Sequence, residues 1–222
     1  MTLRLFEHRR ADRIALMVAG LAALAFVVLM LVVLSRPGML QHLDTAVNGR
    51  AHRFGLQHPL WLSTMSAITR TGSTTYLAPA ASVACLALLR WREWRQAAFV
   101  AVAALVTVGL RLLIVVNVAR PRPAGWLTSA SGWSFPSGHS TAAAAAAAIA
   151  VIVGWPLLRR RRDRLVLAGV TGAWAIAVGV SRVALGVHWP SDVLGAWLLV
   201  AAVVPPIAVG VGAFPARRDG KR

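Results

Sequence analysis

Long apolar segments without charged residues recur along the chain, separated by short polar connections. Ile14–Leu34 is one such segment, and a helix of its length crosses a hydrocarbon core of about 30 Å. A cleaved signal peptide is the competing interpretation, but the segment is longer than an h-region and no A-x-A type of cleavage site follows it. The pattern therefore predicts an all-α integral membrane bundle of six transmembrane helices. The predicted spans are 14–34, 73–89, 96–118, 138–158, 165–186 and 191–213.

The composition agrees with a membrane protein. Of the 222 residues, 58% are hydrophobic and 14% are charged, whereas about a quarter of a soluble domain is charged. Without an internal repeat or a linker, we expect one membrane domain over residues 1–222. Cys85 is the single cysteine and lies in an apolar segment, so we expect no intramolecular disulfide and no metal cluster.

The net charge of +17 would suggest nucleic acid as a partner, but the positions of the basic residues favour the lipid bilayer instead. Most of them border an apolar segment, and six spans place these borders on one side of the membrane. The positive-inside rule makes that side cytoplasmic, with both termini. The basic clusters are Arg4, Arg9, Arg10 and Arg13; Arg90, Arg92 and Arg95; Arg159–Arg162 and Arg164; and Arg217, Arg218, Lys221 and Arg222.

The connections over about 35–72, 119–137 and 187–190 then face outward. In the first, LWLSTMSAITR repeats apolar residues at helical spacing and predicts a short interfacial helix. This connection also holds His42, Asp44, His52 and His58. Its histidines lack tight metal-ligand spacing, and we expect them to be solvated loop residues.

Polar and charged residues gather at the other two outer connections. Ionisable groups bordering a span are costly and therefore suggest function. For one arginine, snorkelling to the interface is the simplest interpretation, but it does not explain arginines, histidines and an aspartate at one membrane face. The set comprises Arg120, Arg122, Ser137, Gly138, His139, Ser181, Arg182, His188 and Asp192.

These residue types suit phosphate chemistry. Arginine donates in a planar fork that matches phosphate oxygens. The fourth span begins after Pro136, which should leave the amides around Ser137–His139 unpaired, as in an anion site at a helix N-terminus.

His188 and Asp192 are four residues apart at the start of the sixth span, so the carboxylate is placed to hold one imidazole nitrogen. The other nitrogen is then an oriented nucleophile, and His139 is placed to protonate a leaving oxygen. The pattern predicts phosphoryl transfer through a phosphohistidine, with no metal and no cofactor.

Three segments resemble the motifs of the type 2 phosphatidic acid phosphatase superfamily, which also contains vanadium haloperoxidases. They are RPRP at 120–123, PSGH at 136–139 and SRVALGVHWPSD at 181–192, and the resemblance spans about residues 70–212. It implies six membrane helices, with His188 as nucleophile, Asp192 as its partner and His139 as general acid. It also implies phosphoryl binding by Arg122, Arg182, Ser137 and Gly138, with assistance from Arg120.

The first motif departs from the family pattern K-x6-R-P, because Val115 stands where the lysine belongs. Arg111 lies four residues earlier on the same helical face, within an otherwise apolar span. One hypothesis is that Arg111 reaches up one turn and replaces the lysine. The alternative is that Arg111 snorkels or pairs elsewhere.

The leading prediction is an integral protein of the cell membrane that hydrolyses a lipid phosphate at the extracytoplasmic face. Polyprenyl diphosphate, phosphatidic acid and phosphatidylglycerophosphate are all admissible substrates, and analogy within the family favours polyprenyl diphosphate. A vanadium-dependent haloperoxidase is an alternative, although no soluble domain is predicted. A non-catalytic lipid-phosphate transporter or scaffold is another, and the pattern leaves the oligomeric state open.

Overall fold

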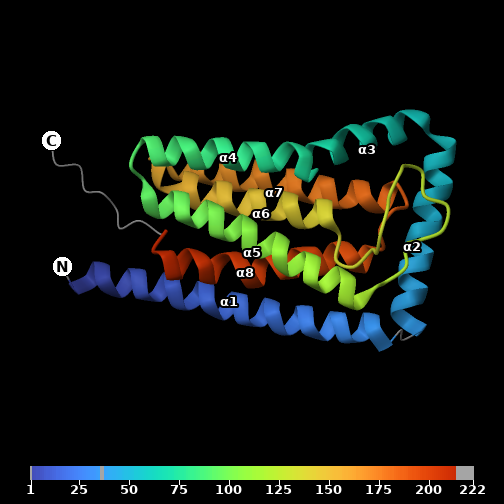
Figure 1. The fold of residues 1–222 in the computed structure, drawn as a ribbon, viewed down its shortest axis with the longest axis horizontal. Helices are drawn as coiled ribbons and strands as arrows, with labels where there is room; N and C mark the ends of the chain where they lie inside the picture. The colour runs from blue at the N-terminus through green and yellow to red at the C-terminus, as the bar shows by residue number, and fades with distance from the viewer. Residues whose placement is uncertain (1, 36–37, 214–222) are drawn as a thin grey trace.

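A computed structural model describes residues 2–35 and 38–213 as a bundle of helices (Figure 1). Within these ranges no strand occurs, in agreement with the predicted all-α class. The helices are α1 (Thr2–Ser35), α2 (Gly38–Gln57), α3 (Pro59–Thr71), α4 (Thr74–Arg90), α5 (Trp94–Val118), α6 (Gly138–Gly154), the short 3₁₀ helix Trp155–Leu157, α7 (Arg161–Ala184) and α8 (Pro190–Val211).

The prediction of six spans is confirmed, because six helical segments among the described residues are long and apolar enough to cross a membrane. Five of them correspond to α1, α5, α6 with its 3₁₀ extension, α7 and α8. The remaining one, Pro59–Arg90, joins α3 and α4 across the turn at Gly72 and Ser73. The second span therefore includes α3, which the sequence indicated only as a separate interfacial helix.

The expectation of a solvated loop in the first outer connection is wrong. Residues 38–57 form α2, which lies across one end of the bundle in Figure 1. His42 and His58 are exposed, but Asp44 and Asn48 are only 2% and 6% exposed. Their spacing of four places both on one face of the helix, and that face is buried. The segment is polar, but its buried positions recur at helical spacing, and it forms a helix packed against the bundle.

The alanine-rich helix α6 lies at the centre of the bundle and packs against both α7 and α8. Ala143, Ala145 and Ala147 are buried in these contacts. Small side chains let the helices approach closely, as the sequence suggested. Close approach also occurs between α7 and α8, where a Cβ added at Gly179 would lie 2.6 Å from the Trp197 ring.

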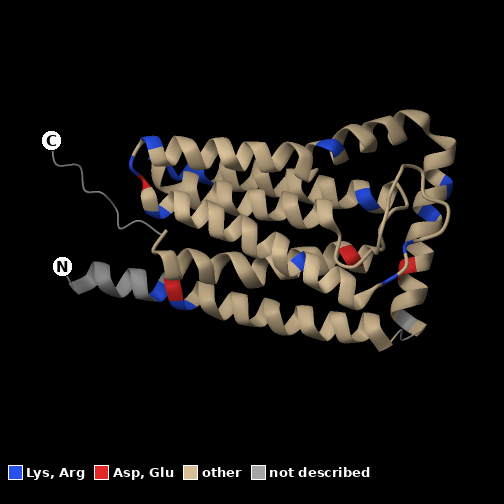
Figure 2. Cartoon of the chain, viewed as in Figure 1, with Lys and Arg blue, Asp and Glu red and all other residues tan. Residues whose placement is uncertain are grey.

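The two ends of the bundle differ in their charged groups (Figure 2). The turn between α4 and α5 and the connection between α6 and α7 carry their arginine clusters at the same end as the start of α1 and the end of α8. The cluster Arg217, Arg218, Lys221 and Arg222 lies outside the described residues. At the opposite end, α2, α3 and the connections 119–137 and 185–189 surround the predicted site residues.

Candidate active site

Two connections far apart in the sequence meet at this end of the bundle. Leu127 N donates to Leu185 O at 2.9 Å, and Ser137 N donates to Asp192 O at 3.1 Å. Phe135 anchors the first connection, because its ring stacks on Phe26 of α1 with centroids 5.8 Å apart. Gly195 of α8 leaves room for that ring, since a Cβ there would lie 2.6 Å from it. Packing thereby joins the starts of α6 and α8.

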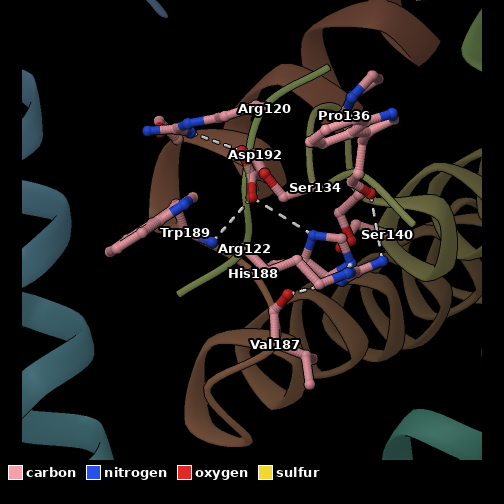
Figure 3. A network of polar contacts seen from close by, with 12 residues as sticks. Arg120, Arg122, Ser134, Pro136, Ser140, Val187, His188, Trp189 and Asp192 are labelled. Carbon is pink, nitrogen blue, oxygen red and sulfur yellow. Dashed lines mark hydrogen bonds and ion pairs between the residues drawn. The ribbon is translucent and has the colours of Figure 1, made fainter. Parts of the chain in front are cut away.

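His188 and Asp192 form a buried pair at the start of α8 (Figure 3). Their side chains are 1% and 0% exposed, and 3.4 Å separates His188 Nδ1 from Asp192 Oδ2. The same carboxylate oxygen accepts the Trp189 N–H at 2.9 Å, so the carboxylate caps the helix while it faces the imidazole. The Asp192 carboxylate therefore has a defined orientation.

Arg122 contacts the other nitrogen of the same imidazole. Its Nη1 donates to Val187 O at 2.7 Å and lies 3.1 Å from His188 Nε2. A guanidinium has no acceptor, so this geometry assigns an unprotonated Nε2 and leaves the proton on Nδ1, facing Asp192. The result is a neutral imidazole whose free lone pair points at a cation.

Burial also favours the neutral imidazole. Desolvation lowers the pKa of His188 to about 4, although the hydrogen bond that Asp192 accepts from the ring acts in the opposite direction. Burial likewise lowers the pKa of the Arg122 guanidinium, which the charge of Asp192 acts to raise. Arginine remains cationic at neutral pH all the same, so the site pairs a neutral imidazole with a permanent positive charge.

Arg182 of α7 is a buried cation whose donors are only partly used. It is 5% exposed, and its Nη1 donates to Thr69 Oγ1 of α3 at 2.8 Å. Its Nε is buried with no hydrogen-bond partner. A buried guanidinium donor without an acceptor is unfavourable unless a ligand supplies one. The unpaired Nε of Arg182 therefore indicates that an anionic ligand binds here.

Arg111 of α5 reaches the PSGH segment. Its Nε donates to Pro136 O at 3.3 Å, and a Cβ added at Gly138 would lie 3.2 Å from its Cζ. The guanidinium therefore packs directly over the Cα of Gly138, where any larger residue would displace it. This position next to Gly138 is compatible with the hypothesis that Arg111 replaces the lysine absent at Val115.

The start of α6 lies beside these arginines. Ser137 precedes the helix and Ser140 Oγ donates to Ser137 Oγ at 2.9 Å. The expectation that the Ser137 amide is unpaired is wrong, because that amide bonds Asp192 O. His139, at the second position of α6, lies within electrostatic range of His188 and of the surrounding arginines.

Arg120 points toward carboxylates. Its guanidinium pairs with Asp192 Oδ1 at 2.6 Å and with Asp44 Oδ2 of α2 at 2.7 Å. Sequence patterns alone overlooked Asp44, Asn48, Thr69 and Ser191 as neighbours of the site. The available signal was the spacing of four between Asp44 and Asn48 in a segment that otherwise looked like a loop.

Within the described part of the chain, Arg111, Arg122 and Arg182 have no carboxylate within 4.0 Å of their nitrogens, whereas Arg120 has two. Uncompensated arginines around a neutral imidazole favour a multiply charged anion. The fold and the site thus define a membrane-embedded helical protein built to receive a phosphate group.

The sequence profile of the PAP2 superfamily matches residues 113–212, which include every one of the three motifs. Phosphatidylglycerophosphatase B of Bacillus subtilis is 29% identical over 144 residues, which cover 63% of this chain and 70% of the relative. The Escherichia coli K12 protein of that name is 43% identical over 74 residues, and the match spans 33% of this chain and only 27% of the relative.

Solved structures agree with the sequence comparisons. The crystal structure of a transmembrane PAP2 type phosphatidylglycerolphosphate phosphatase from Bacillus subtilis superposes with a TM-score of 0.77 at 26% identity, covering 86% of this chain and 94% of the other. Aquifex aeolicus LpxE, with a TM-score of 0.55 at 20% identity over 77% of this chain and 94% of its own, shares the fold. Residues 113–212 thus match the PAP2 superfamily, and over most of its length the chain resembles membrane lipid phosphatases named phosphatidylglycerophosphatase B.

Proposed function

We propose that the protein hydrolyses the phosphate of a membrane lipid at the extracytoplasmic face, through a phosphohistidine and without a metal ion. The observation that carries the proposal is the position of His188 Nε2. It lies 3.1 Å from the Arg122 guanidinium, while Nδ1 faces Asp192 on the other side of the ring. A phosphoryl group that binds Arg122 would take over this contact with the guanidinium and bring its phosphorus atom within reach of the Nε2 lone pair.

In the first step, His188 Nε2 attacks the phosphorus atom and the bond between phosphorus and the leaving oxygen breaks. His139 protonates that oxygen. The new Nε2–P bond makes the ring cationic, and Asp192 stabilises this charge through the Nδ1 proton. Arg111, Arg122 and Arg182 hold the phosphoryl oxygens, together with Ser137 and Gly138.

In the second step, a water molecule attacks the phosphohistidine. Neutral His139 takes a proton from the water, and the N–P bond breaks with its electron pair returning to Nε2. The products are inorganic phosphate and the neutral imidazole of His188. Each residue thereby returns to its starting protonation state.

The distribution of charge supports an extracytoplasmic site. The arginine clusters of the α4–α5 turn and the α6–α7 connection lie at the end opposite His188 (Figure 2). Positively charged connections tend to stay in the cytoplasm, which supports a cytoplasmic location for both termini and an extracytoplasmic location for the site.

A lipid substrate is supported by an apolar groove beside the site. The groove has a volume of about 660 Å³ and is lined by α2, α3, the end of α7 and the start of α8. Phe54, Trp61 and Trp197 contribute aromatic walls, and Pro190 lies two residues from His188. A hydrocarbon chain in this groove would lie next to the catalytic end of α8.

Phosphate release in detergent with EDTA tests the proposal. We expect release from at least one of phosphatidylglycerophosphate, phosphatidic acid and polyprenyl diphosphate, and inhibition by vanadate as a phosphate analogue. Phosphatidylglycerophosphate is the first choice because the similar proteins above carry its name. Folded protein that binds these lipids without releasing phosphate would contradict the proposal and favour a transporter or scaffold. Turnover that requires vanadate would favour a haloperoxidase.

The acid side of the pH dependence follows from the environment of His188. Burial holds its pKa at about 4, so Nε2 keeps its lone pair down to about pH 5 and loses it when protonated below that. We expect the imidazole to titrate near pH 4 in NMR spectra of the detergent-solubilised protein, with the resonance assigned by its loss in His188→Gln. A midpoint at the ordinary value near 6.5 would show that the ring is solvated.

A further inference from the structure

Asp44 is a buried carboxylate on a helix whose other faces are exposed. It is 2% exposed, whereas its neighbours Leu43 and Thr45 on α2 are exposed. A carboxylate buried to this degree must be paired or hydrogen-bonded, because it has lost its hydration. Its partners therefore indicate what the buried charge does.

All the partners of Asp44 belong to the surroundings of Asp192. Its Oδ1 accepts the Ser191 N–H at 3.1 Å, and its Oδ2 accepts the Ser191 hydroxyl at 2.5 Å. Oδ2 also accepts Arg120 Nη2 at 2.7 Å. Ser191 is the second residue of α8, so Asp44 satisfies an amide that the helix itself leaves unpaired. Asp44 thereby fixes the turn that carries Asp192.

Arg120 connects the two carboxylates. Its Nη1 donates to Asp192 Oδ1 at 2.6 Å and to Ser191 Oγ at 2.7 Å, while Nη2 binds Asp44 (Figure 3 shows Arg120 and Asp192). The other oxygen of Asp192 faces His188 Nδ1. One guanidinium therefore neutralises two carboxylates, and the arrangement leaves net negative charge for the imidazole.

A second contact from α2 reaches the histidine itself. Asn48, one turn after Asp44, donates its Nδ2 to His188 O at 3.0 Å. The buried face of α2 thus contacts both members of the His188–Asp192 pair, one through a backbone carbonyl and the other through Arg120. Both contacts join residues that are far apart in the sequence, so they depend on the tertiary fold.

We infer that Asp44 is a positioning residue for the proposed reaction: through Arg120 and Ser191 it keeps the Asp192 carboxylate oriented and its negative charge available to His188. The inference rests on the proposed function. Without Asp44, the full charge of Arg120 falls on Asp192 and opposes the positive charge that develops on the phosphorylated ring. Loss of Asp44 leaves the proposed substrate-binding arginines in place, so we expect it to destabilise the transition state rather than to weaken substrate binding.

The test is the separate measurement of kcat and KM for Asp44→Asn with the lipid that the parent hydrolyses best. We expect kcat to fall about 10–100-fold, as for other outer partners of a catalytic group, with KM within about twofold of the parent. Asp44→Glu retains the charge and should recover part of kcat. Asp163→Asn, which removes an exposed carboxylate at the opposite end of the bundle, should match the parent.

A double-mutant comparison shows whether Asp44 acts through Arg120. If it does, Asp44→Asn combined with Arg120→Gln should lose little more activity than Arg120→Gln alone, whereas independent effects would multiply. If Asp44→Asn does not fold, Arg120→Lys tests the bridge between Asp44 and Asp192 instead, because it keeps a positive charge beside these buried carboxylates. It keeps the charge but loses the fork, and it should lower kcat with KM unchanged.

The outcomes separate this inference from the proposed function. A parent protein that releases no phosphate refutes the function. A parent that releases phosphate while both folded Asp44→Asn and Arg120→Lys retain the parental kcat refutes the role of Asp44. A rise in KM without a fall in kcat also refutes it, because it would place Asp44 in substrate binding.

Discussion

Replacement of His188 by alanine is expected to lower the rate of phosphate release by at least about 10⁴-fold, because the proposed mechanism forms its covalent intermediate on this residue. His188 Nε2 faces Arg122 while Nδ1 faces Asp192, and the side chain is 1% exposed. The measurement is phosphate release in EDTA, together with trapping of radiolabelled phosphate on the protein. We expect acid-labile, alkali-stable label on the parent and none on the variant.

The matched control is His58→Ala. His58 also lies outside the six spans, but it is exposed and its Nδ1 contacts Phe54 O at 2.8 Å, so we expect an unchanged rate. If His188→Ala retained more than about a hundredth of the parental rate, the nucleophile would have to be another group. Loss of activity in both variants would instead indicate a general sensitivity of this end of the bundle.

Removal of Arg111 should have the second-largest effect. Arg111→Ala is expected to lower kcat by about 10²–10³-fold, equivalent to about 2.7–4 kcal/mol of transition-state stabilisation, because the group lies over Gly138, which we propose as part of the phosphoryl site. Arg111→Lys keeps the charge without the planar fork and should lie between the parent and the alanine variant.

A compensating change tests the assignment of Arg111 to the role of the missing lysine. Val115 lies one turn further along α5 and is 6% exposed, so a lysine there starts closer to the outer end of the helix. We expect Val115→Lys to restore part of the activity of Arg111→Ala. Arg70→Ala, an exposed arginine of α3, is the control and should match the parent. Unchanged turnover in Arg111→Ala would show that this cation plays no part in the reaction.

The three motif segments could be identified in the sequence because the residues of each lie close together along the chain. His188 and Asp192 are four residues apart, and PSGH is contiguous, so spacing alone indicated the chemistry of each segment. The span pattern was equally accessible, since an apolar helix of sufficient length crosses a bilayer whatever its neighbours are. The location of the arginine clusters at one end of the bundle likewise followed from their place at the ends of the predicted spans.

The first outer connection shows why other features were not predictable. Residues 38–57 are too polar for a span, and the buried polar contacts of Asp44 and Asn48 help to hold their helix in place. Those contacts span more than a hundred positions, from α2 to the start of α8. From the sequence alone, a carboxylate with such distant partners looks the same as a solvated carboxylate.

By itself, the sequence determined the helical membrane architecture, the three motif segments and the residue types that suit phosphate chemistry, because hydrophobic length and local spacing act within one segment. Only the tertiary structure decided that Arg111 lies over Gly138, that Arg182 is buried with a free Nε, and that Arg120 is held between Asp44 and Asp192. The physical reason is that the direction of a buried charged side chain depends on which opposite charges, carbonyls and empty spaces the packed helices bring within its reach.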